Sequence, residues 1–299
     1  MHHDHDHRRG DDNRRRMAVA LAVNLLLLVA GLGGAVAFGS LALLADAGHV
    51  LSDVAAIALG LFAAAMAARP TDARRTFGFH RTEILAALVN GLLLVAIAVL
   101  VFVEAASRLS DPPDVEGAGV LALGLLGLAG NIAVTLILAR GDRSDLNLEG
   151  VLRHSAADAL GSLGVVASAA IILATDWLYA DPIAGIMIAL LVLAGSWRLV
   201  RDPLNVLMEA APRGIDVDEV GRAMVAVPGV REVHDLHVWT VTSGFPALAA
   251  HVRTEPSEDV DEVRRRVERV LAQRFDIDHT TLQTMVEPLL KVEDRRRKR

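Results

Sequence analysis

Residues 41–68 read LALLADAGHVLSDVAAIALGLFAAAMAA, an apolar stretch interrupted by Asp46, His49 and Asp53. A run of about 20 apolar residues can cross a bilayer as a helix. Open strands cannot satisfy their backbone groups in lipid, so helix is the expected state. The stretch therefore predicts a transmembrane helix with ionisable side chains inside it.

Five more apolar segments surround this one. The predicted spans are Met17–Phe38, Leu41–Ala68, Ile84–Val103, Val115–Ala139, Val151–Ala174 and Leu178–Leu199. Of the 30 Lys and Arg and 36 Asp and Glu, only 25 lie between Met17 and Leu207. A soluble domain does not leave a block of that length so poor in charge. We therefore expect a polytopic membrane protein, which excludes a single soluble enzyme domain, a fibrous protein and a disordered chain.

The overall composition excludes further classes of protein. The 299 residues are 53% hydrophobic and contain no cysteine, which removes disulfide scaffolds, thiolate metal sites and cysteine nucleophiles. The net charge of −6 does not indicate nucleic-acid binding. Abundant Ala and the use of Arg in place of Lys are typical of GC-rich coding and favour a bacterium.

The arginines predict the orientation of the chain in the membrane. Five of them precede the first span, four lie in the second connection and three in the fourth, whereas the opposite connections hold Arg108 alone. Arginine is enriched in cytoplasmic loops. We expect an integral protein of the bacterial inner membrane with both termini in the cytoplasm.

Four regions follow from the change in composition along the chain. They are a His/Asp/Arg-rich tail (1–16), the six-span domain (17–204), a soluble domain (205–290) and a charged tail (291–299). The first tail is either a native metal-gathering segment or in part an expression tag. In the soluble domain the patterns predict helices at Asp216–Val227 and Asp259–Phe275, and strands at Val230–Thr242, Ala247–Arg253 and Thr280–Val286. This α-β-β-α-β order indicates a small sheet with helices on one face.

Two spans each contain a His and an Asp at i, i+4. These are His49 and Asp53 in the second span, and His154 and Asp158 in the fifth. Residues at this spacing share a helix face. A charge at mid-membrane costs about 2.5–3.5 kcal/mol, so such pairs need a partner. Two imidazoles and two carboxylates suit a tetrahedral zinc-like ion better than magnesium or calcium.

A purely structural role for these residues is the alternative. The pairs could form hydrogen bonds that only hold the helices together. Asp46 lies seven residues before Asp53, and it either orients a ligand imidazole from behind or is a polar residue near the helix entrance.

Several motifs make the chain resemble the cation diffusion facilitator family of metal/proton antiporters. They are Leu44–Asp53, Phe77–Glu83, Asn147–Ser162, Asp181-Pro182 and His234–Trp239. The resemblance runs from about Met17 to Val286. It implies a six-helix all-α transmembrane bundle, a metallochaperone-like (ferredoxin-like) α+β cytoplasmic domain, and a homodimer in membrane lipid.

The resemblance also implies sites. It places the transport site at His49, Asp53, His154 and Asp158, and a His at the first of these positions resembles zinc-selective members. His80 matches a loop site, although it could instead pack against Phe77 and Phe79. A regulatory zinc site in the cytoplasmic domain would use His234, His251 and His279. Met285 stands where the family often has a carboxylate, so a metal-free dimerisation domain is the alternative there.

The expected function is zinc export from the cytoplasm in exchange for protons. We expect no prosthetic group and no nucleic-acid partner. Zinc is expected to act both as the substrate and as a regulator. Metal binding needs deprotonated ligands and so releases protons. The alternatives are transport of cobalt, cadmium, iron or manganese, and a metal sensor or scaffold without flux. An intramembrane zinc enzyme is disfavoured, because four protein ligands leave no position for water and no His-Glu-x-x-His motif occurs.

Overall fold

The computed structural model describes residues 22–139 and 146–286, without the side chains of 137–139 and 146–157. The predicted tails 1–16 and 291–299 lie outside this part of the chain. Contacts divide the described residues into two units, one formed by residues up to 62 and 86–200, and the other by 63–85 and 201 onward. Each unit is described by itself.

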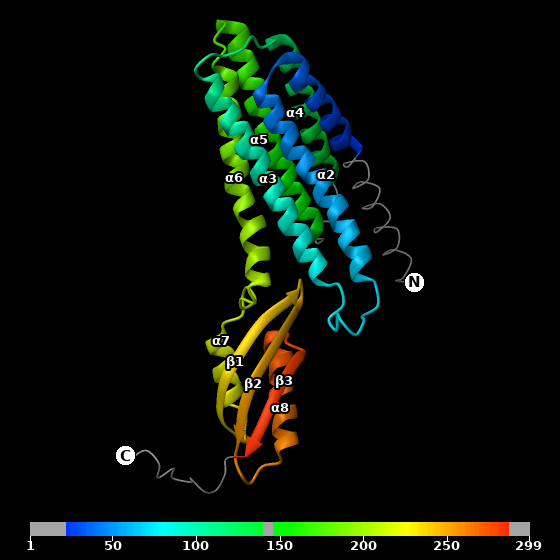
Figure 1. Cartoon of the computed structure of the whole chain (residues 1–299), viewed down its shortest axis with the longest axis vertical. Coiled ribbons are helices and arrows are strands. Elements are labelled where there is room, and N and C mark those ends of the chain that lie inside the picture. The colour runs from blue at the N-terminus through cyan, green and yellow to red at the C-terminus, as the bar shows by residue number, and fades with distance from the viewer. Residues whose placement is uncertain (1–21, 140–145, 287–299) are drawn as a thin grey trace, which may run out of the picture. The chain divides into compact units, whose positions relative to one another are not determined.

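The first unit is a bundle of long apolar helices (Figure 1). A helix at Ala22–Phe38 precedes the five that are labelled, which are α2 (Leu41–Ala67), α3 (Arg81–Arg108), α4 (Gly117–Ala139), α5 (Leu146–Thr175) and α6 (Ala180–Leu207). Among the described residues, these five are long and apolar enough to cross a membrane, and Ala22–Phe38 is a shorter apolar helix. The predicted class of a helical transmembrane domain is confirmed.

Small residues bring the helices of this bundle close together, as expected for helices packed in lipid. A Cβ atom at Gly91 of α3 would lie 2.9 Å from the backbone carbon and oxygen of Leu199 in α6. One at Gly48 of α2 would lie 2.6 Å from a methyl carbon of Ile97 in α3. The buried core consists largely of small and branched side chains, including Ala35, Ala42, Leu43, Ala45, Ala98, Val101, Val120, Val165, Ala169 and Ile172.

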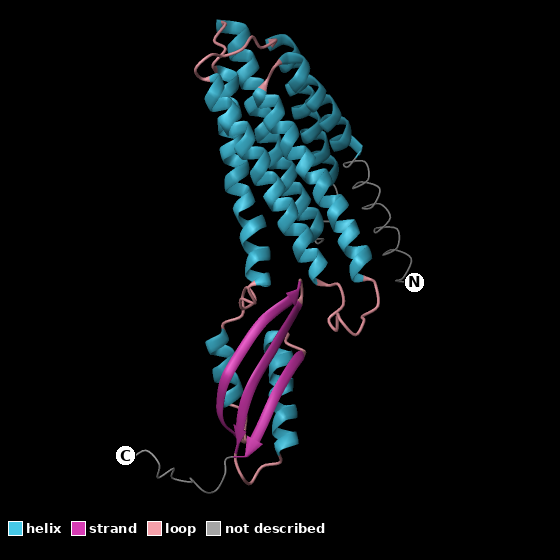
Figure 2. Ribbon diagram, in the orientation of Figure 1, coloured by secondary structure: helices cyan, strands magenta, loops and turns pink. Residues whose placement is uncertain are grey.

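The C-terminal part of the chain forms a three-stranded sheet with two helices, α7 and α8, which Figure 2 shows beside the strands. Its elements are α7 (Val217–Val225), β1 (Val230–Thr242), β2 (Phe245–Thr254), α8 (Val260–Phe275) and β3 (His279–Val286). The strand order is β1-β2-β3; β1 and β2 are antiparallel, and β2 and β3 are parallel. The predicted α-β-β-α-β domain is thus confirmed as α+β. β2 begins two residues earlier than predicted because Ser243 and Gly244, which has a φ of +69°, complete the turn alone.

Both helices of this domain cover the same face of the sheet. Each starts with an aspartate N-cap, Asp216 or Asp259, whose side chain accepts hydrogen bonds from the backbone N–H groups of the first turn. The core between helices and sheet contains Val220, Met224, Val238, Leu248, Ala250, Val252, Val263, Val267, Leu271 and Ile277. The alternate residues of each strand therefore face away from the helices.

Candidate metal centre

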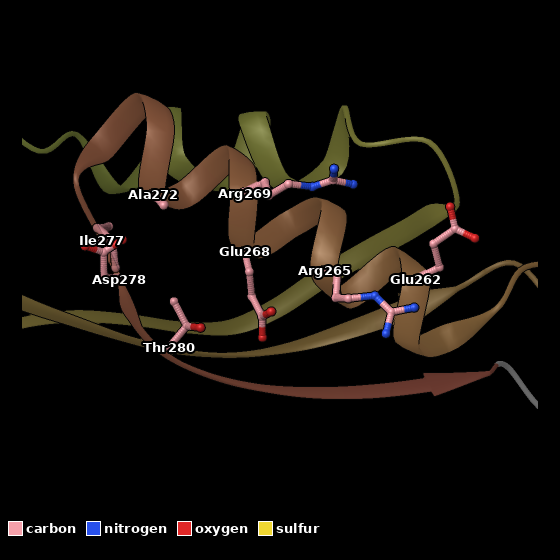
Figure 3. Close-up of a pocket in the computed structure, with 8 residues that line it drawn as sticks. All are labelled: Glu262, Arg265, Glu268, Arg269, Ala272, Ile277, Asp278 and Thr280. Carbon is pink, nitrogen blue, oxygen red and sulfur yellow. The ribbon is translucent and has the colours of Figure 1, made fainter.

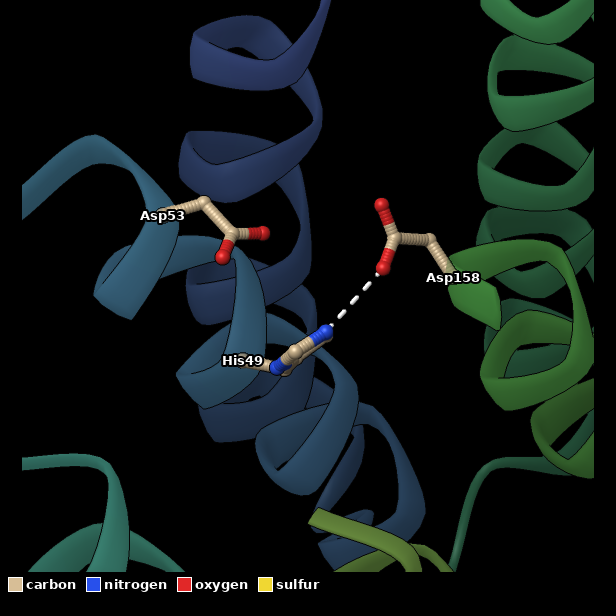
Figure 4. Close-up of side chains that lie close together, drawn as sticks. All are labelled: His49, Asp53 and Asp158. Atoms are coloured by element: carbon tan, nitrogen blue, oxygen red, sulfur yellow. Dashed lines mark hydrogen bonds and ion pairs between the residues drawn. The ribbon is translucent and has the colours of Figure 1, made fainter. Parts of the chain in front are cut away.

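His49 and Asp53 project from the same face of α2, because they are one helical turn apart. Asp158 projects toward them from α5 (Figure 4). The Nε2 atom of His49 lies 3.0 Å from Oδ1 of Asp158. One ligand atom from each of the three residues lies within 4.8 Å of the other two. The structure thus brings together three of the four residues predicted for the transport site.

The three side chains are largely withdrawn from the surface. The side chain of His49 is 22% exposed and that of Asp158 is 5% exposed. A buried carboxylate is costly unless it is paired with a cation or a hydrogen-bond donor. A divalent cation at this position would neutralise both carboxylates, and the imidazole nitrogen would favour a transition metal over magnesium or calcium.

The fourth predicted ligand, His154, lies outside the described side chains. Its position on α5 is one helical turn before Asp158. Residues four apart on a helix share a face, so the backbone is compatible with His154 beside the other three. Its role as a ligand stays a prediction.

Asp46 is connected to α5 by a hydrogen bond. Its Oδ2 accepts a hydrogen bond of 3.3 Å from the hydroxyl of Ser162, and the hydroxyl oxygen accepts one of 3.1 Å from the side-chain amide of Asn131 on α4. Ser162 and Asn131 are buried. Asp46 therefore belongs to a polar connection between α2, α5 and α4, close to the helix turns that carry His49, Asp53 and Asp158.

A second polar connection joins α2 to α3 beside Asp53. The hydroxyl of Ser52 donates a hydrogen bond of 3.3 Å to the side-chain oxygen of Asn90, and both residues are buried. Ser52 and Ser162 were not predicted to be part of the site, because serine is common in membrane helices and a single serine does not indicate a function. The signal that could have found them is their spacing, one residue before Asp53 and four after Asp158.

His80 lies in the connection between α2 and α3, which groups with the C-terminal unit. Its ring packs edge-on against Phe245, with centroids 6.4 Å apart, a contact that the expected packing against Phe77 and Phe79 did not include. The nearby carboxylate of Asp72 accepts hydrogen bonds from the backbone N–H groups of Arg74 and Arg75, which hold its pKa below the usual range. Asp72 thus stabilises the turn of this loop, and a metal at His80 stays a prediction.

His234 and His251 face each other across β1 and β2. They are paired in register, and their rings are 5.1 Å apart and nearly perpendicular. Nδ1 of His234 is buried and has no hydrogen-bond partner among the described residues. An imidazole nitrogen in that state can serve as a metal ligand.

Asp235 adds a carboxylate to this histidine pair. It has a φ of +53° at a bulge in β1, which directs its side chain between two histidines. One oxygen lies 3.0 Å from Nε2 of His237 and the other 4.0 Å from Nε2 of His251. Asp235 was not predicted as a ligand, because strict alternation along a strand does not reveal a bulge.

His279 does not join that group. Gln283 is the residue of β3 that pairs with His251, and His279 pairs with Ala247, four residues away along the strand. Four residues of strand span about 13 Å. The ring of His279 instead contacts Phe77 and Phe245, with centroids 5.6 and 5.3 Å apart.

A cavity of about 820 Å³ in the C-terminal domain lies elsewhere, beside α8 and the start of β3 (Figure 3). Its charged residues have mixed sign and are Glu262, Arg265, Glu268, Arg269 and Asp278. Within the described chain, His49, Asp53 and Asp158 are the group of three or more side chains close enough to hold a metal. The intramembrane cluster is therefore the strongest candidate for the functional site.

Two protein-family models match the chain. The cation efflux transmembrane domain matches residues 17–208, and the cation efflux protein cytoplasmic domain matches residues 212–288. The chain therefore belongs to the cation efflux family, as the motifs predicted. It is a membrane transporter of cations and not an enzyme.

Characterised relatives cover almost the whole chain. It is 42% identical to the metal cation efflux system protein CzcD of Cupriavidus metallidurans, over 96% of this chain and 90% of that protein. It is 39% identical to the zinc transporter ZitB of Escherichia coli K12, over 96% and 94%. The solved metal-bound C-terminal domain of the CzcD transporter is 39% identical, with coverage of 24% of this chain and 99% of that one, and a TM-score of 0.23.

Proposed function

We propose that this transporter exports zinc from the cytoplasm in exchange for protons, and that His49, Asp53, His154 and Asp158 hold the ion in transit. The observation that carries the proposal is the convergence of His49, Asp53 and Asp158 from two apolar helices within 4.8 Å. In a membrane interior such a cluster is costly without a cation or protons to neutralise it.

Exchange follows from the chemistry of the ligands. A divalent ion binds neutral imidazole and ionised carboxylate, so its binding displaces protons from the same atoms. A site that faces the two sides of the membrane in turn would carry metal one way and protons the other. A relative of 35% identity from Bacillus velezensis is named a cadmium, cobalt and zinc/H(+)-K(+) antiporter, which supports a proton-coupled mechanism.

Zinc is the proposed substrate because His49 provides a nitrogen ligand and because ZitB is named a zinc transporter. The alternative is another divalent transition ion, such as the cobalt and cadmium in the name of the Bacillus protein. Iron and manganese are further alternatives. All of these alternatives use the same site and differ in which metal is transported. Competition between metals in the flux assay would show which ion the protein prefers.

The test is metal flux in proteoliposomes with an imposed pH gradient. The unmodified chain should take up zinc when the gradient is imposed, and Asp53→Ala and Asp158→Ala should each lose that uptake. Asp111→Ala removes an exposed carboxylate from the connection after α3 and should leave flux unchanged. Unchanged flux in both ligand variants would move the site elsewhere, and folded, metal-binding protein without flux would favour a sensor or scaffold.

The remaining expectations belong to the same proposal. The protein would work as a homodimer in the inner membrane of a bacterium, with both termini in the cytoplasm, and the match to the family's cytoplasmic domain at residues 212–288 supports that orientation. We assign its regions as 1–16, 17–204, 205–290 and 291–299. His234 and His251, with Asp235, would bind a regulatory zinc ion, supported by the buried Nδ1 of His234.

A further inference from the structure

The turn before α2 is held by a carboxylate from a distant helix. Asp181, in the first turn of α6, has an exposed fraction of 0%. Its carboxylate accepts hydrogen bonds from the hydroxyl of Ser40 at 2.5 Å and from the backbone N–H groups of Leu41 at 2.7 Å and Ala42 at 3.3 Å. These three donors lie about 140 residues earlier in the chain.

The start of a helix has N–H groups without partners inside the helix. Ser40 satisfies one of them in α2, because its hydroxyl oxygen accepts a hydrogen bond from the N–H of Leu43. Asp181 satisfies two more, and its negative charge is favoured by the helix dipole at this end. Because a buried carboxylate is stable only with such donors, α6 is tied to the first turn of α2.

Two other helices contact the same turn. Nη1 of Arg108, the last residue of α3, donates a hydrogen bond of 2.6 Å to the carbonyl oxygen of Gly39. The N–H of Glu116, just before α4, donates one of 3.2 Å to the carbonyl oxygen of Phe38. A Cβ atom at Gly185 of α6 would lie 3.3 Å from the Cβ of Leu41, so α2 and α6 also pack closely here.

We call Ser40, Arg108 and Asp181 the α2 clamp. The clamp and the candidate metal centre lie at opposite ends of the first ten residues of α2. Leu41 and His49 are eight residues apart, which corresponds to about 12 Å along a helix. Seven of the ten residues from Leu41 to Val50 are buried, whereas none of the nine described residues from Val54 to Phe62 is. The route from the clamp end to His49 is therefore filled with side chains.

We propose that Asp181 is a positioning residue that holds the first turn of α2 against α6 and so keeps this end of the bundle closed to aqueous solutes. This inference rests on the proposed function in one respect: in a transporter, a closed end would prevent an open path through the metal centre. The closure itself can be measured without transport.

Because the chain has no cysteine, a single introduced cysteine reports on access. Ala45 is buried on α2 between the clamp and His49. In Ala45→Cys protein reconstituted in nanodiscs, a polar maleimide should react slowly. Adding Asp181→Asn, which replaces one acceptor oxygen by a donor facing the α2 N–H groups, should raise that rate at least tenfold.

Two controls separate closure from general damage. Asp176→Asn makes the same chemical change at an exposed residue before α6 and should leave the rate at Ala45→Cys unchanged. A cysteine at the exposed Ser110 should react at the same rate with and without Asp181→Asn. Zinc binding by the Asp181→Asn protein, kept within threefold, would show that the fold is intact.

A folded Asp181→Asn protein with an unchanged rate at Ala45→Cys overturns the inference. If that variant does not fold, Ser40→Ala takes its place, because it removes one donor to Asp181 and no charge. It should raise the rate at least threefold, and no rise would equally overturn the inference. Loss of zinc flux in Asp53→Ala tests the proposed function separately and does not affect this result.

Discussion

At the scale of single residues, the candidate metal centre is flanked by hydrogen-bonded side chains that are not themselves among its proposed ligands. Ser162 connects Asp46 of α2 to Asn131 of α4 while its own helix carries Asp158. The hydroxyl thus connects α2 and α5, the two helices that carry the proposed ligands. Hydrogen-bonding groups just outside the ligands of a metal site typically contribute tenfold to a hundredfold to metal affinity.

Ser162→Ala should therefore lower zinc affinity by at least tenfold, because α2 and α5 lose a hydrogen bond beside the ligands. Zinc titration of the purified full-length protein measures this. Ser168→Ala is the matched control: Ser168 is also buried on α5, but it bonds the carbonyl oxygen of Val165 on its own helix. Equal affinities for the two variants would show that the Asp46–Ser162 bond has no part in the site.

Residue patterns predicted part of this site and missed the rest. The i, i+4 spacing suffices to place His49 beside Asp53 on one helix face. It does not reveal which hydroxyl of α5 reaches Asp46, because that depends on the rotation of two helices about their axes. For the same reason His279 separates from His251, since only the register of β2 and β3 determines that Gln283 takes the neighbouring position.

At the scale of elements, the bundle depends on close approach of helix backbones. Gly91 of α3 faces the backbone of Leu199 in α6, and an added methyl group would lie 2.9 Å from its carbon and oxygen atoms. Backbone atoms cannot turn aside as a flexible side chain can. The contact therefore requires glycine on one side.

Gly91→Ala should push α3 and α6 apart, with a loss of stability of about 1–3 kcal/mol, the usual cost of overpacking. Thermal unfolding of the full-length protein in detergent should show a lower midpoint. Gly195→Ala is the control within α6, because a Cβ atom there would meet nothing within 4 Å. A midpoint as high for Gly91→Ala as for Gly195→Ala would mean that the two helices can adjust without cost.

The helices and strands themselves were predicted well, and the ends of the helices less well. Apolar length predicted the membrane helices, but α3 begins at Arg81 and ends at Arg108 rather than spanning Ile84–Val103. Helices continue beyond the hydrocarbon region, where polar residues such as Glu83 and Arg108 end up at the bilayer surface or in contacts with other elements. In the C-terminal domain the aspartate caps and turn glycines determine the ends locally, so the prediction was within two residues for α7, β1, β2, α8 and β3.

At the scale of the whole molecule, the C-terminal sheet carries the histidine pair on the face directed away from α7 and α8. α7 and α8 cover one face with the apolar core. The ring centroids of His234 and His251 are 5.1 Å apart. A carboxylate oxygen of Asp235 lies 4.0 Å from Nε2 of His251. A metal bound there would link β1 to β2 and add an interaction that only the folded protein makes.

Zinc should consequently raise the unfolding temperature of the full-length protein, and chelation should reverse the rise. Binding to the folded state at one hundred times Kd adds about 2.7 kcal/mol. Asp53→Ala protein, in which the proposed transport site is disabled, should retain this response, and adding His251→Ala should abolish it. Adding Thr281→Ala, a change at an exposed residue of β3, should leave the zinc response intact. A zinc response that persists without His251 would place the stabilising ion elsewhere and leave the sheet as a metal-free surface for association.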